Sequence, residues 1–211
     1  MIIPSVNCKD ESCIKNRFKQ INDFNCEWVH LDITDGKFSN WKTWSNPKFL
    51  KEEKLTDKYK IEVHLMVENP ESVIDDWIDV GASRVIVHIE SDFDPENIYK
   101  KIKNSEVELM LALKPDTPLS ELDKFDKDYF SFVQVLGVDP GPSGSGFQNH
   151  IPDKIRDLRD KYKDVKIEVD GGINENTTKL VKEAGADLIV SASYIFNSEN
   201  SKENYDKLLN I

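Results

Sequence analysis

The chain has 211 residues, which is long enough for one domain with a substantial core and short for two, so we expect a single domain over residues 1–211. Its net charge of −11 argues against a general nucleic-acid surface or an anionic-membrane surface, because long-range repulsion would oppose both. No stretch approaches the roughly 20 apolar residues of a membrane span, and the first residues lack the pattern of a signal peptide. Cys8, Cys13 and Cys26 have no zinc-ribbon spacing, so we expect unpaired thiols and a cytoplasmic location.

Eight short apolar runs recur along the chain, each followed by a turn and then by a segment of helical character. The runs are Ile2–Pro4, Trp28–Asp32, Ile61–Met66, Arg84–Ile89, Glu108–Leu113, Phe132–Leu136, Lys166–Asp170 and Leu188–Ser191. Strands that alternate with helices predict parallel βαβ units. Eight such units predict a closed (β/α)₈ barrel, and the chain length is at the low end for that fold.

Helix signals between these runs are uneven. Asn69-Pro70-Glu71 has the cap residue and the N1 proline of a helix start, and Asn174 caps a second helix. The predicted buried faces are Val73, Ile74, Trp77 and Ile78 in the first helix and Leu180, Val181 and Ala184 in the second. Two further helices are expected over residues 151–162 and 201–209.

Polar side chains end three of the predicted strands. A strand has a period of two, so His30 and Asp32 share one face. His64 ends the third run and Asp170 ends the seventh. A barrel gathers the C-terminal ends of its strands around one axis, and two imidazoles with two carboxylates suit Zn²⁺, Mn²⁺, Fe²⁺ or Co²⁺ without choosing among them. Each residue alone is more often a hydrogen-bonded core or rim residue, but four at one barrel mouth favour a metal site.

Glycine-containing turns follow the last strands. Residues 140–146 follow the sixth run, Gly171-Gly172 follows the seventh, and Ala192-Ser193 follows the eighth. Glycine lets backbone N–H groups approach an anion closely, and the loops after strands seven and eight of such barrels often bind phosphate. Ordinary turn chemistry is the alternative interpretation of each turn taken singly.

Several other polar and aromatic residues carry weaker signals. His88 and Glu90 share a face near the end of the fourth strand, where they could support the site or form a polar rim. Lys114 ends the fifth strand and could contact an anion or pair with a carboxylate. Trp41 and Trp44 lie in a long loop, where capping the barrel, a subunit contact and a substrate contact all remain open.

Taken together, these motifs resemble the ribulose-phosphate 3-epimerase family over nearly the whole chain. The segments that carry the resemblance are His30–Phe38, Val63–Met66, Val87–Glu90, Ala112–Pro118, Val138–Gly141 and Val169–Ile173. The resemblance implies a single (β/α)₈ TIM barrel of the ribulose-phosphate-binding type. It also implies one divalent metal ion and the interconversion of ketopentose 5-phosphates epimeric at C3, in carbohydrate metabolism.

The resemblance implies roles for individual residues. The metal ligands would be His30, Asp32, His64 and Asp170, with Asp32 and Asp170 also acting as acid/base groups. The substrate-binding positions would be Ser5, His64, Pro142, Ser143, Gly144, Ser145, Gly171, Gly172, Ala192 and Ser193. Inverting a carbon beside a ketone requires proton removal from one face and return to the other, so two opposed acid/base groups suit the reaction. A metal would stabilise the enediolate between the two steps.

The expected reaction is D-ribulose 5-phosphate to D-xylulose 5-phosphate. The chain departs from the family pattern at Thr34, Leu136, Ser39-Asn40 and the loop Gly141–Ser145. These departures leave open the 3-epimerisation of another sugar phosphate, such as allulose 6-phosphate or a surface-polysaccharide precursor. The family is commonly oligomeric, so a homo-oligomer is compatible with the sequence, which fixes no number of subunits.

Three rival functions fit the same barrel class. Lys114 keeps a Schiff-base aldolase open, because such an enzyme needs a lysine at the end of a strand. A decarboxylase of the orotidine-phosphate type has Asp-x-Lys-x-x-Asp where this chain has Asp32-Ile33-Thr34-Asp35, so Thr34 speaks against it. A non-catalytic phosphosugar-binding barrel is disfavoured by the intact acid/base pair.

Overall fold

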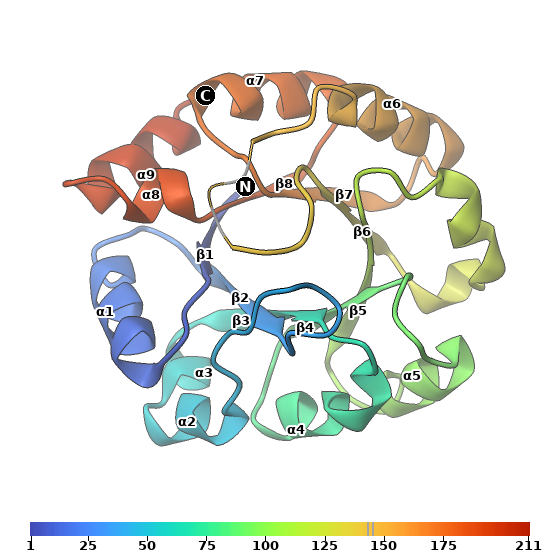
Figure 1. Cartoon of the computed structure of the whole chain (residues 1–211), viewed down its shortest axis with the longest axis horizontal. Coiled ribbons are helices and arrows are strands. Elements are labelled where there is room, and N and C mark those ends of the chain that lie inside the picture. The colour runs from blue at the N-terminus through green and yellow to red at the C-terminus, as the bar shows by residue number, and fades with distance from the viewer. Residues whose placement is uncertain (143, 145) are drawn as a thin grey trace.

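Eight parallel strands close into a barrel, and the helices surround it as an outer ring in the computed structural model (Figure 1). The strands are β1 (Ile2–Val6), β2 (Trp28–Thr34), β3 (Lys60–Met66), β4 (Arg84–His88), β5 (Glu108–Leu113), β6 (Phe132–Leu136), β7 (Lys166–Asp170) and β8 (Leu188–Ser191). The structure describes residues 1–142, 144 and 146–211. Each strand pairs with its neighbour in sequence, and β1 closes the barrel against β8. The predicted TIM barrel and its eight strands are confirmed.

The outer ring is built from helices of very different lengths. They are α1 (Glu11–Ile21), α2 (Pro47–Glu52), α3 (Leu55–Lys58), α4 (Ile74–Asp79), α5 (Pro95–Ile102), α6 (Ile151–Lys161), α7 (Glu175–Ala184), α8 (Ser193–Phe196) and α9 (Ser201–Leu209), with 3₁₀ turns η1 (Pro70–Ser72), η2 (Leu119–Lys124) and η3 (Lys127–Tyr129). The helices expected over residues 151–162 and 201–209 are α6 and α9. The helix expected from Asn69 is divided into η1 and α4, because Val73 between them has a non-helical φ of −127°.

Helix α7 begins at the predicted cap but buries a different face. The Asn174 side chain accepts hydrogen bonds from the backbone N–H groups of Asn176 and Thr177. Leu180, expected in the core, is 45% exposed, whereas Thr178 is fully buried beside Val181. The prediction for Leu180 was wrong because it assigned the inner face by hydrophobicity alone, and the helix turns a threonine inward instead.

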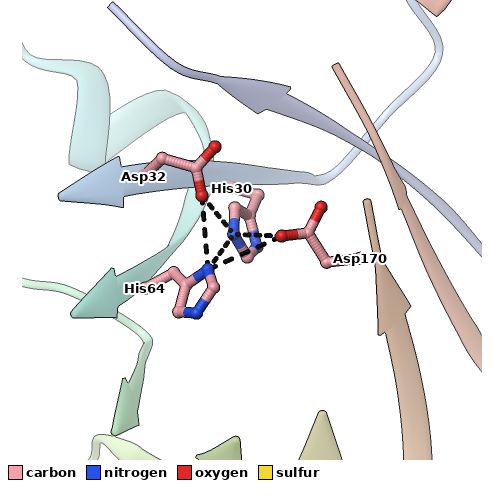
Figure 2. A group of neighbouring side chains, drawn as sticks. All are labelled: His30, Asp32, His64 and Asp170. Atoms are coloured by element: carbon pink, nitrogen blue, oxygen red, sulfur yellow. Dashed lines mark hydrogen bonds and ion pairs between the residues drawn. The ribbon is translucent and has the colours of Figure 1, made fainter. Parts of the chain in front are cut away.

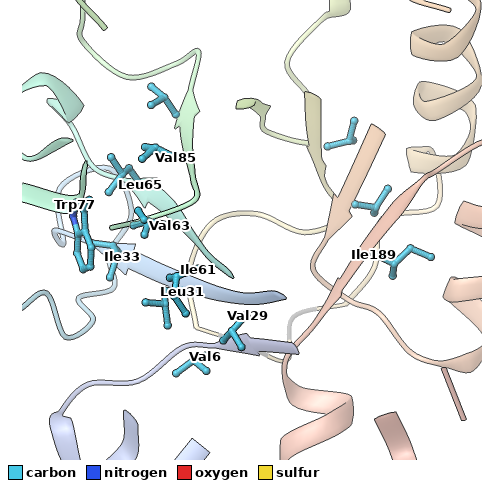
Figure 3. Close-up of a cluster of buried hydrophobic side chains, with 14 of the residues drawn as sticks. Val6, Val29, Leu31, Ile33, Ile61, Val63, Leu65, Trp77, Val85 and Ile189 are labelled. Atoms are coloured by element: carbon cyan, nitrogen blue, oxygen red, sulfur yellow. The ribbon is translucent and has the colours of Figure 1, made fainter. Parts of the chain in front are cut away.

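Apolar side chains fill the space between the barrel and the helices. Along β2, Val29, Leu31 and Ile33 point outward into this layer (Figure 3). The layer also holds Val6, Ile61, Val63, Leu65, Trp77, Val85 and Ile189. A strand alternates its faces, so the intervening His30 and Asp32 point into the barrel. The outer core is therefore what turns the polar residues of the same strands toward the axis.

The cysteines differ from the sequence expectation. Cys8, just after β1, and Cys13, in α1, form a disulfide with their Cα atoms 5.7 Å apart, while Cys26 is free. The prediction of unpaired thiols was wrong for this pair because only the fold brings the end of β1 within disulfide reach of the first turn of α1. Trp44 is also buried, in contact with the rings of Phe49 and Trp77, so it packs in the core.

Among the described helices, none combines the length and the apolar character that crossing a bilayer would need.

Candidate active site

Four side chains from three strands converge at the C-terminal mouth of the barrel (Figure 2). The Nε2 atom of His30 lies 3.2 Å from Oδ1 of Asp32 and 3.2 Å from Nδ1 of His64. The same His64 nitrogen is 3.3 Å from Oδ1 of Asp32 and 3.6 Å from Oδ2 of Asp170. The structure therefore brings together the four residues that the sequence selected.

The spacing of these four atoms suits a single small cation. Nε2 of His30 lies 4.0 Å from Oδ2 of Asp170. A tetrahedral ion with bonds of about 2.0–2.2 Å has ligand atoms roughly 3.4 Å from one another, which is the middle of the observed distances. Two nitrogen and two carboxylate donors suit a divalent transition metal. The group could therefore hold such an ion with little rearrangement.

Protein charges already compensate one another at Asp32. Burial alone would raise the pKa of this carboxyl, but the neighbouring His30 and His64 rings hold it well below its usual range. Burial would lower the pKa of His30, yet its contacts with Asp32 and Glu62 raise that pKa well above the ordinary value. In the absence of a metal, the positive charge of a protonated His30 therefore balances the Asp32 carboxylate, as a bound cation would.

The pKa values of Asp170 and His64 are shifted in the opposite direction from those of Asp32 and His30. Burial first, and the charge of Asp32 second, raise the pKa of Asp170 to about 7. Burial lowers the pKa of His64 to about 3, which keeps this ring neutral. Two carboxylates with separated pKa values are what a pair of complementary acid and base groups requires.

A polar layer lies one step below this cluster inside the barrel. Glu62 accepts from Nδ1 of His30 at 2.8 Å and pairs with Nη1 of Arg84 at 2.7 Å. Gln134 donates to Glu168 at 3.0 Å, and burial raises the pKa of Glu168 well above its ordinary value. His30 with Glu62 and Glu168 is a second group whose atoms lie close enough to hold an ion, but the Arg84 guanidinium already supplies positive charge to Glu62.

A cleft opens beside the four-residue cluster. It is lined by the catalytic candidates Asp32 and Asp170 and by predicted substrate residues. The predicted residues on its wall are Pro142, Gly144, Gly171, Gly172, Ala192 and Ser193. Ser143 and Ser145, also predicted to bind substrate, lie outside the described residues. The predicted substrate contact His64 is fully buried beneath the cleft and does not line it.

The turn after β7 has a conformation that depends on glycine. Gly171 and Gly172 have φ angles of +99° and +70°, in the left-handed region. A Cβ on Gly172 would lie 2.8 Å from the Cα of Phe147, and one on Gly171 would lie 2.6 Å from a methyl of Val138. The turn therefore presents backbone to the cleft where any larger residue would collide.

Ser5 in β1 and an additional residue, Asn7, just after β1, both contact Asp32. The Ser5 hydroxyl donates to Oδ2 of Asp32 at 2.9 Å, and the Asn7 amide donates to the same oxygen at 3.0 Å. Asn7 also accepts from the Trp41 indole at 3.1 Å and lines the cleft, which Ser5 does not. Asn7 was not predicted from the sequence, although it lies only two residues after Ser5.

Thr34 and Leu136, the departures noted in the sequence, lie in different surroundings. Leu136 lines the cleft, together with Met66. The Thr34 hydroxyl donates to the carbonyl of Trp41 at 2.6 Å and does not line the cleft. Of the two departures, only Leu136 can contact a molecule bound there.

His88, Glu90 and Lys114 form a polar group next to His64. Nε2 of His88 lies 2.9 Å from Nε2 of His64, and Nδ1 of His88 lies 3.0 Å from Oε2 of Glu90. Glu90 accepts from the Lys114 backbone N–H at 2.8 Å, while the Lys114 ammonium lies 3.9 Å above the Phe38 ring. Lys114 is therefore directed at an aromatic face and away from the four-residue cluster.

Comparison with known proteins decides the family. The sequence profile of the Ribulose-phosphate 3 epimerase family matches residues 1–196. A relative from Chlamydia pneumoniae named ribulose-phosphate 3-epimerase is 33% identical over 206 residues, which cover 95% of this chain and 89% of the relative. The chain belongs to this family. A member from Oryza sativa subsp. japonica, named as the cytoplasmic isoform, is 32% identical over 205 residues, covering 96% and 90% of the two chains.

Membership of the ribulose-phosphate 3-epimerase family makes the chain an isomerase of the epimerase class that acts on carbohydrates. Solved structures agree on the fold. The 3-hexulose-6-phosphate synthase of Salmonella typhimurium superposes with a TM-score of 0.73 over 98% of this chain and 95% of its own, at 13% identity. At that identity the similarity shows a shared barrel and nothing about the substrate.

Proposed function

We propose that the protein interconverts D-ribulose 5-phosphate and D-xylulose 5-phosphate in a metal-dependent reaction within pentose phosphate metabolism. The observation that carries this proposal is the convergence of two imidazoles and two carboxylates beside a cleft with glycine turns. The relatives' names supply the substrate. We take residues 1–211 as one catalytic domain.

The proposed acid/base pair is Asp32 and Asp170. In the closed barrel, β2 and β7 are separated by β1 and β8, so the two carboxyls approach the cleft from well-separated directions. Without a metal, burial raises the pKa of Asp170 to about 7 while the pKa of Asp32 lies well below its usual range, so the surroundings of the two carboxyls already differ. The proposed roles are that one carboxyl accepts a proton while the other donates one. Inversion at C3 then follows from removal on one face and return on the other.

His30, Asp32, His64 and Asp170 would hold one divalent ion, and their donor set fits Zn²⁺, Fe²⁺, Mn²⁺ or Co²⁺ equally. When bound, the ion supplies positive charge that stabilises the enediolate of the substrate. Ser5 and Asn7 donate to Oδ2 of Asp32 and so fix the orientation of that carboxylate.

The phosphate group would bind at the turn after β7 and the start of α8. Gly171 and Gly172 present backbone at the cleft wall, and Ala192 and Ser193 lie on the same wall. Successive N–H groups in such turns form concave anion sites. The loop carrying Pro142 and Gly144 completes this side of the cleft.

A different sugar phosphate is the second candidate substrate, because the residues that line the cleft beside Asp32 could accept one. Asn7 and Leu136 both line it, and they set its polarity and width beside Asp32. An amide here could hydrogen-bond an additional hydroxyl of a longer ketose phosphate such as allulose 6-phosphate. A comparison of kcat/KM over ketose phosphates ranks the substrates, since specificity is that ratio.

The deciding experiment is turnover of D-ribulose 5-phosphate in D₂O with a divalent metal supplied. D-xylulose 5-phosphate with deuterium at C3 is the expected product. Asp32→Asn and Asp170→Asn should each lower kcat by about 10²–10⁴-fold, the usual contribution of a general acid or base. Asp157→Asn, at an exposed position on α6, is the matched control and should retain full activity. Absence of both epimerisation and exchange in the wild type would refute the proposal.

We place the enzyme in the cytoplasm, as the name of the Oryza relative suggests. Cytosolic reductants keep most thiols reduced, so Cys8 and Cys13 would then be a dithiol in the cell. Assembly into a homo-oligomer is compatible with the proposed function, and light scattering of the purified chain measures it.

A further inference from the structure

A chain of hydrogen bonds runs from His64 away from the four-residue cluster. His64 has Nδ1 directed at Asp32 and Asp170, and its Nε2 lies 2.9 Å from Nε2 of His88. The other His88 nitrogen lies 3.0 Å from Oε2 of Glu90. Both imidazoles are fully buried, so no solvent molecule at the surface competes for these four ring nitrogens.

Only two arrangements of ring protons satisfy this chain. A nitrogen–nitrogen hydrogen bond needs one donor and one acceptor. If His64 donates from Nε2, its Nδ1 carries a free lone pair, and His88 must carry its proton on Nδ1. If His88 donates from Nε2 instead, His64 must be protonated on Nδ1, and that nitrogen cannot bind a metal.

Glu90 selects between the two arrangements. Its Oε1 accepts from the Lys114 backbone N–H at 2.8 Å and from the Thr117 hydroxyl, so the carboxylate is fixed as an acceptor. An acceptor at Oε2 requires the proton of His88 on Nδ1. His88 Nε2 is then an acceptor, His64 donates to it, and Nδ1 of His64 is free for the metal.

The far end of the chain is anchored by α6. The Lys154 ammonium donates to the carbonyls of Lys114, Pro115 and Thr117 at 2.7, 2.9 and 2.6 Å. These bonds hold the turn that carries both donors to Glu90. The carboxylate is therefore positioned from outside the barrel axis and does not depend on a bound ligand.

We infer that His88 and Glu90 are positioning residues that hold His64 in the Nδ1-unprotonated tautomer needed for metal binding. The inference rests on the proposed metal site. It goes beyond that site by giving a role to His88 and Glu90, neither of which is a proposed metal ligand or lines the cleft. Outer partners of this kind contribute about 10–100-fold to metal affinity. His30 has a shorter equivalent, since Glu62 accepts directly from its Nδ1 at 2.8 Å.

The test is Co²⁺ binding by the full chain after metal removal, measured by competition with a chelator. His88→Phe keeps an aromatic ring against His64, where the centroids are 5.0 Å apart, and removes the acceptor. It should weaken Co²⁺ binding by about 10–100-fold. His88→Gln restores an acceptor oxygen and should recover most of that loss. Phe38→Leu changes the packing on the His88 ring 4.7 Å away and the contact with the Lys114 ammonium, but removes no member of the hydrogen-bonded chain. It is the matched control and should bind Co²⁺ like the wild type.

A second readout separates positioning from packing. The ¹⁵N shifts of His64 in the metal-free protein should report a proton on Nε2 in the wild type and a mixture of tautomers in His88→Phe. If His88→Phe does not fold, Glu90→Gln gives the same readouts. The amide of a glutamine can donate a hydrogen bond to Nδ1 of His88, so His88 is no longer restricted to the tautomer with its proton on Nδ1. Folded variants with wild-type Co²⁺ affinity and an unchanged tautomer would overturn the inference, whereas a wild type that binds no metal would refute the proposed function.

Discussion

At the scale of single residues, the four proposed ligands followed from two features of the sequence. The alternation of a strand placed His30 and Asp32 on one face, and the ends of the third and seventh runs supplied His64 and Asp170. The structure confirms that these four side chains meet. Their roles stay predictions until turnover and metal binding are measured.

The raised pKa of Asp170 predicts how stability depends on pH in metal-free protein. The native carboxyl keeps its proton up to about pH 7, whereas the unfolded one, with an ordinary pKa of 3.8, releases it earlier. The stability that this group contributes is complete below pH 3.8 and is lost as pH rises toward 7. Asp170→Asn stays neutral, so relative to wild type it should gain up to about 1.4 kcal/mol in unfolding free energy per pH unit across this window.

Urea unfolding in a chelating buffer, at several pH values for both proteins, measures the difference. The remaining titrating groups are common to the two chains, so the difference reports Asp170 together with the neighbouring charges of Asp32, His30 and Glu62. Saturating divalent metal should reverse its sign, because the wild type alone keeps the full ligand set and is stabilised by binding. A difference that does not change with pH would contradict the assignment.

Glu62 and Glu168, in the polar layer below the four-residue cluster, were not predicted from the sequence to have a role. Glu62 and Glu168 each precede a selected residue by two positions, so alternation alone put them on the inner face. They were not singled out because an inward glutamate could equally sit near the barrel floor as a simple ion pair. Their contacts with His30 and Gln134 depend on the pairing of neighbouring strands.

At the scale of elements, the strands were predicted more accurately than the helices. Each strand is a short apolar run bounded by turns, and all eight matched within a few residues. In α7 the cap was predicted correctly but the buried face was not, because Thr178 and not Leu180 faces inward. A threonine side chain is small enough to pack against the barrel, so hydrophobicity alone is a poor guide to the inner face of this helix.

The turn between β7 and α7 should tolerate no side chain at Gly172. An alanine there must adopt a φ of +70°, and its Cβ would meet the Phe147 backbone at 2.8 Å. Left-handed backbone costs about 1–2 kcal/mol and overpacking about 1–3 kcal/mol, so Gly172→Ala should lose roughly 2–5 kcal/mol of stability.

Equilibrium urea unfolding measures the Gly172→Ala loss, and KM for the sugar phosphate should rise because the turn forms part of the proposed phosphate site. Gly146→Ala is the control, since a Cβ at that glycine has no atom within 4 Å. Equal stability of the two variants would show that the turn relaxes at no cost.

At the scale of the whole molecule, a buried arginine links three neighbouring strands beneath the proposed metal site. Arg84 on β4 pairs with Glu62 on β3 at 2.7 Å and with Glu108 on β5 at 2.6 Å. Its guanidinium also lies 4.3 Å from the ring centroid of Trp28 and 4.0 Å from that of Phe132. One side chain thus links strands around the axis beneath the proposed metal site.

Arg84→Met should destabilise the fold by about 3–5 kcal/mol, because it leaves the buried Glu62 carboxylate without its guanidinium partner, with only the contact to His30 remaining. Adding Glu62→Gln to that variant removes the unpaired charge and should recover part of the loss. Denaturant unfolding of the two single variants and the double variant gives the coupling energy. A loss below about 1 kcal/mol for Arg84→Met would show that the Arg84–Glu62 ion pair contributes no more than a solvent-exposed ion pair does.

The sequence by itself determined the barrel, its eight strands and the four residues at its mouth, because strand alternation and strand ends are local properties of the chain. Only the tertiary structure decided which polar atoms meet across strands, including His64 with His88, Asn7 with Asp32, and Cys8 with Cys13. The physical reason is that alternation fixes the face of a side chain, whereas the distance between side chains on different elements depends on barrel closure and strand stagger.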